Sequence, residues 1–138
     1  MLQIGKQYVS DMIVHALEED PNECCGILAG VDWSVSHMYR ISNTSASPYR
    51  YLMDPQQQLN AMLDSERAGW EFIAFYHSHT HSQAYPSPTD VRMAQQSGWL
   101  GPDIYYILVS LEDKSSPQVR AFHILESGDI DEEEFQVI

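Results

Sequence analysis

The residues best suited to chemistry lie in the segment FYHSHTHSQAYPSPTDVRMA, residues 75–94. His77 and His79 are two positions apart at the end of an apolar run typical of a strand, so their side chains share one face. Two adjacent imidazoles supply half of a zinc site, and a catalytic site needs a third protein ligand plus room for water. Asp90, about one turn into a following helix, is the candidate third ligand. His81 competes, although the residues that follow it indicate that the strand has ended.

A purely structural explanation exists for the same residues. Two histidines in a strand are often ordinary surface residues, and SPTD at 87–90 fits a capping box with Ser87 as N-cap, proline at N1 and Asp90 at N3. A cap stabilises by about 1 kcal/mol, whereas a structural zinc site contributes on the order of 10 kcal/mol. We therefore expect metal coordination to take Asp90 while Ser87 still caps the helix. Two histidines and a carboxylate also suit Fe(II), which leaves a non-haem iron site as an alternative.

A distant glutamate completes a longer pattern. Glu23 stands at the head of the strand-like run ECCGILAG, and alone it would be an ordinary surface residue of a loop. Together with His77, His79, Ser87 and Asp90, however, it resembles the signature of the JAMM (MPN-plus) metalloprotease family. That signature is a distant glutamate followed by H-x-H-x7-S-x2-D, and the spacing here matches it throughout. ECCGILAG is also similar to the segment around the family's glutamate.

The resemblance covers roughly residues 23–125 and implies both a fold and a chemistry. It implies the JAB/MPN (cytidine-deaminase-like) architecture and one Zn²⁺ per chain held by His77, His79 and Asp90. It also implies that Glu23 is the general acid/base and that the Ser87 hydroxyl stabilises the oxyanion. Zinc lowers the pKa of bound water to about 7, so the resemblance predicts a zinc peptidase active at neutral pH.

Two departures from many eukaryotic members narrow the expected substrate. Thr80 stands where those proteins carry proline, and the chain is too short for the insertions that deubiquitinases use to hold ubiquitin. YHSHTHSQAYPSPTDV and SPYRYLMDP (47–55) instead resemble the bacterial branch of sulfur-carrier-protein–cysteine peptidases. That branch implies hydrolysis after the C-terminal Gly-Gly of a ubiquitin-like sulfur carrier protein, with release of cysteine. The alternatives are a deubiquitinase-like isopeptidase and a non-catalytic MPN scaffold that only binds partners.

The elements that must position these residues can be read from periodicity and punctuation. The pattern predicts a single α/β (α+β) domain over residues 1–138, in which helices flank one mixed, curved sheet. Predicted helices cover 6–19, 54–69 (with Asp54 as N-cap and Gly69 at the end) and 88–97; predicted strands cover 24–31, 34–41, 71–78, 104–111, 118–125 and 134–138. Two helical faces are expected to be buried: Val9, Met12, Ile13, Ala16 and Leu17 in the first helix, and Leu59, Met62 and Leu63 in the second. His15 falls on the polar side of the first helix.

Composition excludes several classes of partner. The chain has 138 residues with 20 acidic and 7 basic side chains, which give a formal net charge of −13. This charge disfavours nucleic acid and anionic membranes, although an acidic face could dock a basic segment of a partner. The first residues, MLQIGKQYVS, lack the pattern of a signal peptide, so we expect none. The adjacent pair Cys24 and Cys25 is poorly suited to a disulfide, which favours a reducing, cytoplasmic location.

Overall fold

The strand that carries His77 and His79 runs through the middle of the sheet. This strand, β4 (Glu71–His79), lies between β2 (Cys25–Val31), to which it is antiparallel, and β5 (Tyr105–Ser110), to which it is parallel. Every residue from 73 to 79 is buried, as expected for a strand covered on both faces. The two histidines therefore lie at the end of a strand that hydrogen bonds hold along both edges.

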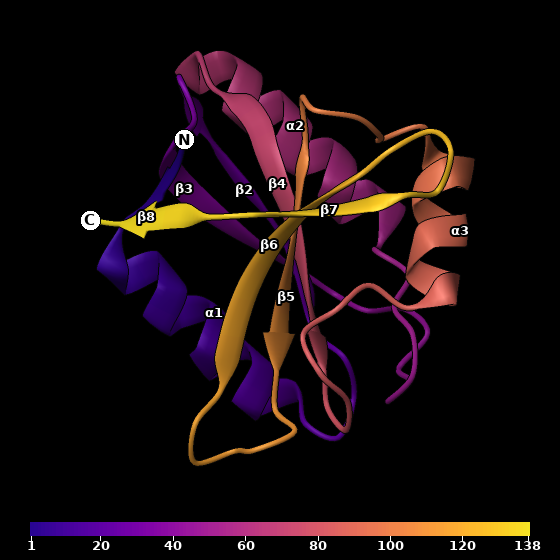
Figure 1. Cartoon of the computed structure of the whole chain (residues 1–138). Coiled ribbons are helices and arrows are strands. Elements are labelled where there is room, and N and C mark those ends of the chain that lie inside the picture. The colour runs from indigo at the N-terminus through magenta and orange to yellow at the C-terminus, as the bar shows by residue number, and fades with distance from the viewer.

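The computed structural model describes all 138 residues, as eight strands in one curved sheet with three helices (Figure 1). The strand order is β7-β6-β5-β4-β2-β3-β1-β8. The remaining elements are β1 (Leu2–Ile4), α1 (Lys6–Glu19), β3 (Ser34–Ile41), α2 (Pro55–Ala68), α3 (Pro88–Ser97), β6 (Gln118–Ile124), β7 (Ile130–Glu133) and β8 (Phe135–Val137). This architecture confirms the predicted mixed α and β class with one curved sheet.

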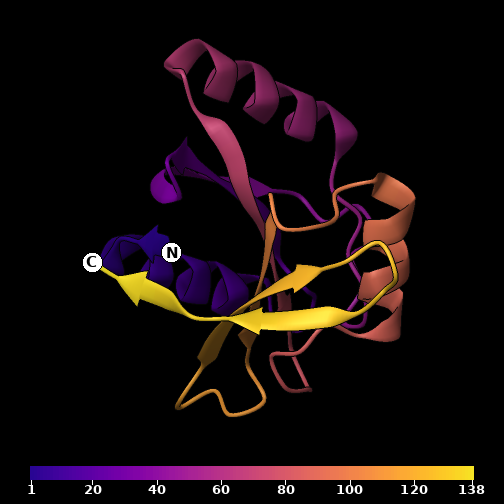
Figure 2. The same ribbon diagram turned by 45° about the horizontal axis from the view of Figure 1, so that its top comes forward.

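The sheet separates two apolar cores. On one face, Met12 and Ala16 of α1 pack with Tyr76 of β4. On the other face, α2 and α3 contribute alanines that pack with Phe75. Figures 1 and 2 show α1 and α3 on opposite sides of the central strands. Because side chains alternate along a strand, His77 and His79 share the α2 and α3 face with Phe75.

The predicted helix boundaries are confirmed. Asp54 caps α2 by accepting a hydrogen bond from the Gln57 N–H at 2.9 Å. Gly69 ends α2 and Gly98 ends α3, with φ of 78° and 79°. A left-handed residue closes the last turn of a helix, and glycine adopts that conformation without steric cost.

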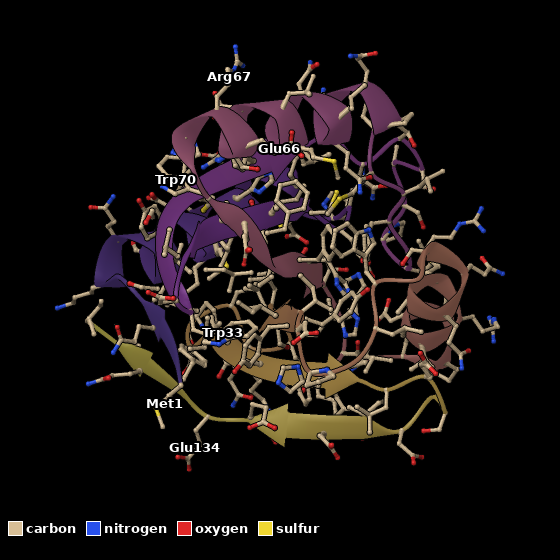
Figure 3. All side chains as sticks on the ribbon, turned by 90° about the horizontal axis from the view of Figure 1, so that it is seen from above. Met1, Trp33, Glu66, Arg67, Trp70 and Glu134 are labelled. Atoms are coloured by element: carbon tan, nitrogen blue, oxygen red, sulfur yellow. The ribbon has the colours of Figure 1, made fainter.

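Two short strands were missed by the sequence reading, which predicted the order αββαβαβββ. β1 has three residues and pairs in parallel with β3 and with β8, so only contacts distant in sequence define it. Figure 3 shows Met1 beside Glu134, at the adjacent starts of β1 and β8. β7 has the acidic sequence IDEE, which lacks the apolar alternation of a half-buried strand, and pairs only with β6 at the edge of the sheet.

The predicted helical faces are partly wrong. In α1, Leu17 is 43% exposed, whereas His15 is buried and contacts Tyr76, contrary to the polar side expected for it. In α2, Leu59 and Leu63 are 47% and 49% exposed, because the helix presents its small residues to the sheet. The residues of α2 that are buried are Ala61 and Ser65. Figure 3 shows Arg67 pointing outward from α2.

None of the three helices has the length and apolar character needed to cross a membrane.

Candidate metal centre

The two histidines of β4 lie side by side and are almost fully buried. The ring centroids of His77 and His79 are 5.1 Å apart, and the residues are 1% and 5% exposed. The ring of Tyr51 lies against the ring of His77, with centroids 4.4 Å apart. The strand therefore presents two imidazoles in a confined space, with an aromatic wall on one side.

The first turn of α3 brings a carboxylate to both rings. Asp90 Oδ2 lies 2.9 Å from His79 Nε2 and 3.1 Å from His77 Nε2. The same oxygen accepts a hydrogen bond from the Ser87 N–H at 2.9 Å, while Ser87 Oγ accepts one from the Asp90 N–H at 3.1 Å. The capping box predicted from SPTD is present, and it fixes Asp90 in a position that faces the two histidines. Asp90 thus takes part in the capping box of α3 and contacts both histidines at the same time.

His77 carries an unusual pair of unpartnered nitrogens. Its approach to Asp90 lacks the geometry of a hydrogen bond, so Nδ1 and Nε2 are both buried without a partner. His79 differs, because its Nδ1 lies 2.9 Å from the Gln83 carbonyl oxygen and donates to it. That bond leaves Nε2 as the ligand-forming nitrogen, in the manner typical of metal-binding histidines. One ligand atom from each of His77, His79 and Asp90 lies within 4.8 Å of the others.

The electrostatics of the cluster favour a cation. Burial alone would raise the pKa of Asp90, but the adjacent imidazoles and the Ser87 N–H hold it well below its usual range. For His79, burial lowers the pKa, yet the bond to Asp90 outweighs burial and the net shift is upward. A buried carboxylate that stays ionised between two imidazoles is suited to share a positive charge, whether that charge is a proton or a metal ion.

The start of β2 places Glu23 beside this cluster. Cys24 pairs with Ser78: the Cys24 N–H donates to Ser78 Oγ at 2.8 Å, and the Ser78 N–H donates to the Cys24 carbonyl at 3.1 Å. Because these strands are antiparallel, residue 23 lies next to residue 79. Glu23 is 3% exposed and its Oε1 has no hydrogen-bond partner. Burial raises the pKa of Glu23 to about 8, with His79 opposing the shift and Asp90 adding to it.

A small cavity of about 150 Å³ is lined by three of the five predicted site residues. Glu23, His79 and Ser87 all line it, so the structure brings the catalytic candidates to one space. The other lining residues are Pro48, Tyr49, Thr80, His81 and Ser82. His81 is exposed and lies beyond the end of β4, outside the cluster of possible ligands. Sequence reasoning missed the wall formed by Tyr51; only the resemblance of 47–55 drew attention to that loop.

Comparison with known proteins identifies the family. A family model described as prokaryotic homologs of the JAB domain matches residues 5–125. The chain belongs to this JAB-domain family. Among solved structures, a protein from Desulfitobacterium hafniense is 33% identical with a TM-score of 0.86, covering 100% of this chain and 93% of that one. A JAB1/MPN domain protein from Archaeoglobus fulgidus, 17% identical with a TM-score of 0.64 over 99% of this chain and 97% of its own, shares the fold.

Two curated relatives match most or all of the chain. The CysO-cysteine peptidase of Mycobacterium tuberculosis is 36% identical over 140 residues, which is 100% of this chain and 92% of the relative. The probable TtuB-protein conjugate cleaving protease of Thermus thermophilus is 31% identical over 131 residues, which is 94% of this chain and 80% of the relative. These peptidase relatives confirm that the chain belongs with JAB-family hydrolases.

Proposed function

We propose that this JAB-domain protein is a zinc-dependent peptidase that hydrolyses the bond after the C-terminal Gly-Gly of a ubiquitin-like sulfur carrier protein. The released group would be cysteine or another amine-linked residue. Support comes from the CysO-cysteine peptidase, which is similar along the whole chain, and from the TtuB-protein conjugate protease. The branch resemblance in 47–55 and 76–91 favours the same class of substrate.

The observation that carries the proposal is the position of Glu23. Its buried, unpartnered Oε1 belongs to a carboxyl group that shares the small cavity with Ser87 and His79. A buried polar atom without a partner is rare in folded proteins, and a catalytic role or a bound water or ion is among the explanations for one. The orphaned nitrogens of His77, with Nε2 of His79 and the ionised Asp90, form a donor set that suits zinc.

In this proposal Glu23 moves the proton. Burial raises the pKa of Glu23 to about 8 in the metal-free protein, and a bound cation nearby would lower it toward neutral pH, where the carboxylate can accept a proton. General acid–base catalysis of this kind contributes about 10²–10⁴-fold. Glu23 would take a proton from the attacking water and return it to the nitrogen of the leaving amine. Zinc, when bound, supplies a Lewis acid that makes water more acidic and polarises a carbonyl.

Ser87 would stabilise the developing oxyanion. As the N-cap of α3, its Oγ accepts from the Asp90 N–H, so the hydroxyl hydrogen remains free to donate into the cavity. A single such donor is worth about 10²–10³ in rate. The Gln83 carbonyl keeps His79 in one tautomer, which orients the ring toward Asp90 and the shared space.

The cavity favours a narrow substrate. The cavity of about 150 Å³ adjoins a larger groove of about 670 Å³, and both are lined by His79, Ser82 and Ser87. A Gly-Gly tail carries no side chains, so it could extend from the groove into the narrow cavity beside Glu23. An extended tail can also bind through main-chain hydrogen bonds, which demand no particular side chains. This geometry suits a carrier tail that ends in two glycines.

Mass spectrometry of a carrier–cysteine adduct tests the proposal. The adduct is incubated with the zinc-loaded protein, with Glu23→Gln as the inactive control and a ubiquitin dimer as the competing substrate. We expect loss of cysteine from the adduct with the wild-type protein alone. Cleavage of the ubiquitin dimer with an intact adduct would refute the carrier assignment, and cleavage of neither would favour the non-catalytic scaffold. Iron rather than zinc in the purified protein, with no cleavage of the adduct, would favour the alternative of a non-haem iron oxygenase.

A further inference from the structure

The side-chain amide of Asn43, just after β3, uses its full capacity for hydrogen bonding. Its Nδ2 donates to the Glu23 carbonyl at 3.0 Å and to the Arg50 carbonyl at 3.1 Å. Its Oδ1 accepts from the Ser45 N–H at 3.0 Å and from the Leu52 N–H at 2.9 Å. An amide has two donor hydrogens and two acceptor lone pairs, so all four are satisfied. The Asn43 side chain therefore forms hydrogen bonds with three separate segments of the backbone.

The loop held by Asn43 forms one wall of the candidate active site. The loop (residues 44–52) begins and ends at backbone groups that Asn43 binds directly. Within it, Tyr51 lies against the His77 ring, and Pro48 and Tyr49 line the cavity that contains Glu23. A second bond joins loop and glutamate, because the Glu23 N–H donates to the Ser47 carbonyl at 2.9 Å.

Turn formation and loop closure explain three of these four contacts, because Arg50, like Ser45 and Leu52, lies in the loop 44–52. Acceptance from Ser45, two residues on, is the Asx-turn that asparagine forms in many loops, and the bond from Leu52 closes the same loop. Donation to Glu23 serves neither purpose, because Glu23 lies outside the loop, just before β2, where the antiparallel pairing of β2 with β3 brings it opposite Asn43. The bond to Glu23 fixes the backbone from which the unpartnered carboxyl group projects.

We propose that Asn43 is a positioning residue that holds the backbone of Glu23 and the loop 44–52 as one unit around the cavity. The inference rests on the proposed function for the role of Glu23, and Asn43 itself does not touch the reacting atoms. Without its amide donors, the Glu23 carboxyl group would sample positions in which proton transfer fails. The expected consequence is a fall in kcat that exceeds any rise in KM, because proton transfer depends on the position of Glu23, whereas the loop 44–52 supplies only part of the cavity wall.

Asn43→Asp separates the two halves of the contact set. Aspartate has the same shape and keeps an acceptor for the Ser45 and Leu52 N–H groups, but it cannot donate to the Glu23 and Arg50 carbonyls. Asn43→Ala removes all four bonds without adding charge. Thr44→Val is the matched control, because it deletes one hydrogen bond of the same loop, from Thr44 Oγ1 to the Leu52 carbonyl, without touching Glu23.

Hydrogen–deuterium exchange measures, without any substrate, whether Asn43 holds the Glu23 backbone; these hydrogen bonds of Asn43 are called the tether. In zinc-loaded Asn43→Asp, the amides of residues 22–25 and 44–52 should exchange at least tenfold faster than in the wild type. Amides of β5 should be unchanged, and Thr44→Val should leave residues 22–25 unchanged. Equal exchange of residues 22–25 in Asn43→Asp and wild type would overturn the tether.

A double-mutant cycle then tests whether the tether acts through Glu23. We expect Asn43→Asp and Asn43→Ala each to lower kcat at least tenfold with less than threefold change in KM and full zinc content. In a Glu23→Gln background, we expect Asn43→Asp to add less than twofold. Equal fold losses in both backgrounds, or full activity in Asn43→Ala, would overturn the proposal. A wild-type protein that cleaves no adduct would refute the proposed function, while the exchange result would still decide whether Asn43 holds Glu23.

Discussion

Replacing Glu23 by glutamine should stabilise the metal-free protein at alkaline pH. The pKa of Glu23 is raised by burial from 4.5 to about 8, so the folded chain keeps a proton that the unfolded chain has released. The free energy of unfolding therefore falls as pH rises from about 4.5 to about 8. Each pH unit in this interval costs about 1.4 kcal/mol, so the total approaches an upper limit of about 5 kcal/mol. Glutamine keeps the shape of the side chain and removes this titration.

Urea unfolding of the chelator-treated protein at pH 5 and pH 8 measures the effect. The stability of Glu23→Gln relative to wild type should improve by several kcal/mol between the two pH values, within the limit above. Glu134→Gln, an exposed change of the same type, should shift nothing. A stability difference between Glu23→Gln and wild type that does not vary with pH would refute the view that this carboxyl group is held protonated. With zinc bound, the same variant should retain its metal and lose about 10²-fold or more in turnover.

Three further predictions concern residues around the site. Burial and Arg40 lower the pKa of His15 to about 4, so the free energy of unfolding should fall as pH drops from about 6.5 to about 4. The urea midpoint of His15→Gln should fall less than that of the wild type over the same pH range. In Gly26→Ala the new Cβ would lie 2.1 Å from the Tyr76 ring, so thermal unfolding should show a loss of about 1–3 kcal/mol. Ser87→Ala and Asp54→Ala each remove a helix N-cap worth about 1 kcal/mol, but only Ser87→Ala should also lower turnover, by about 10²–10³-fold; equal turnover in the two would exclude Ser87 from the chemistry.

The geometry of the cluster was predictable because local rules set it. The period of a strand put His77 and His79 on one face, and the capping signature placed Asp90 in the first turn of α3. Glu23 had no local signal beyond the resemblance to a family, since its position depends on the pairing of β2 with β4. The catalytic and ligand roles of these residues remain predictions that the experiments above address.

Features that depend on contacts between residues distant in sequence could not be predicted from the sequence. β1 has only three residues, and its pairing with β3 and β8 defines it. The prediction that Leu59 and Leu63 are buried was wrong, because α2 approaches the sheet through the small residues Ala61 and Ser65 and leaves both leucines exposed. Asn43 has no sequence signal of its role, since neither its type nor its neighbours show that its amide reaches Glu23. In each case the sequence shows the type of the residue but not the residues that surround it in the folded protein.

Zinc content per chain is the most direct test of the central claim, that His77, His79 and Asp90 form the metal centre. The wild-type protein and single alanine variants are purified identically, equilibrated with zinc, desalted and analysed by elemental mass spectrometry. We expect one zinc per chain in the wild type and in His81→Ala, and none in His77→Ala, His79→Ala or Asp90→Ala. Zinc that remains in His77→Ala but is lost from His81→Ala would contradict this claim.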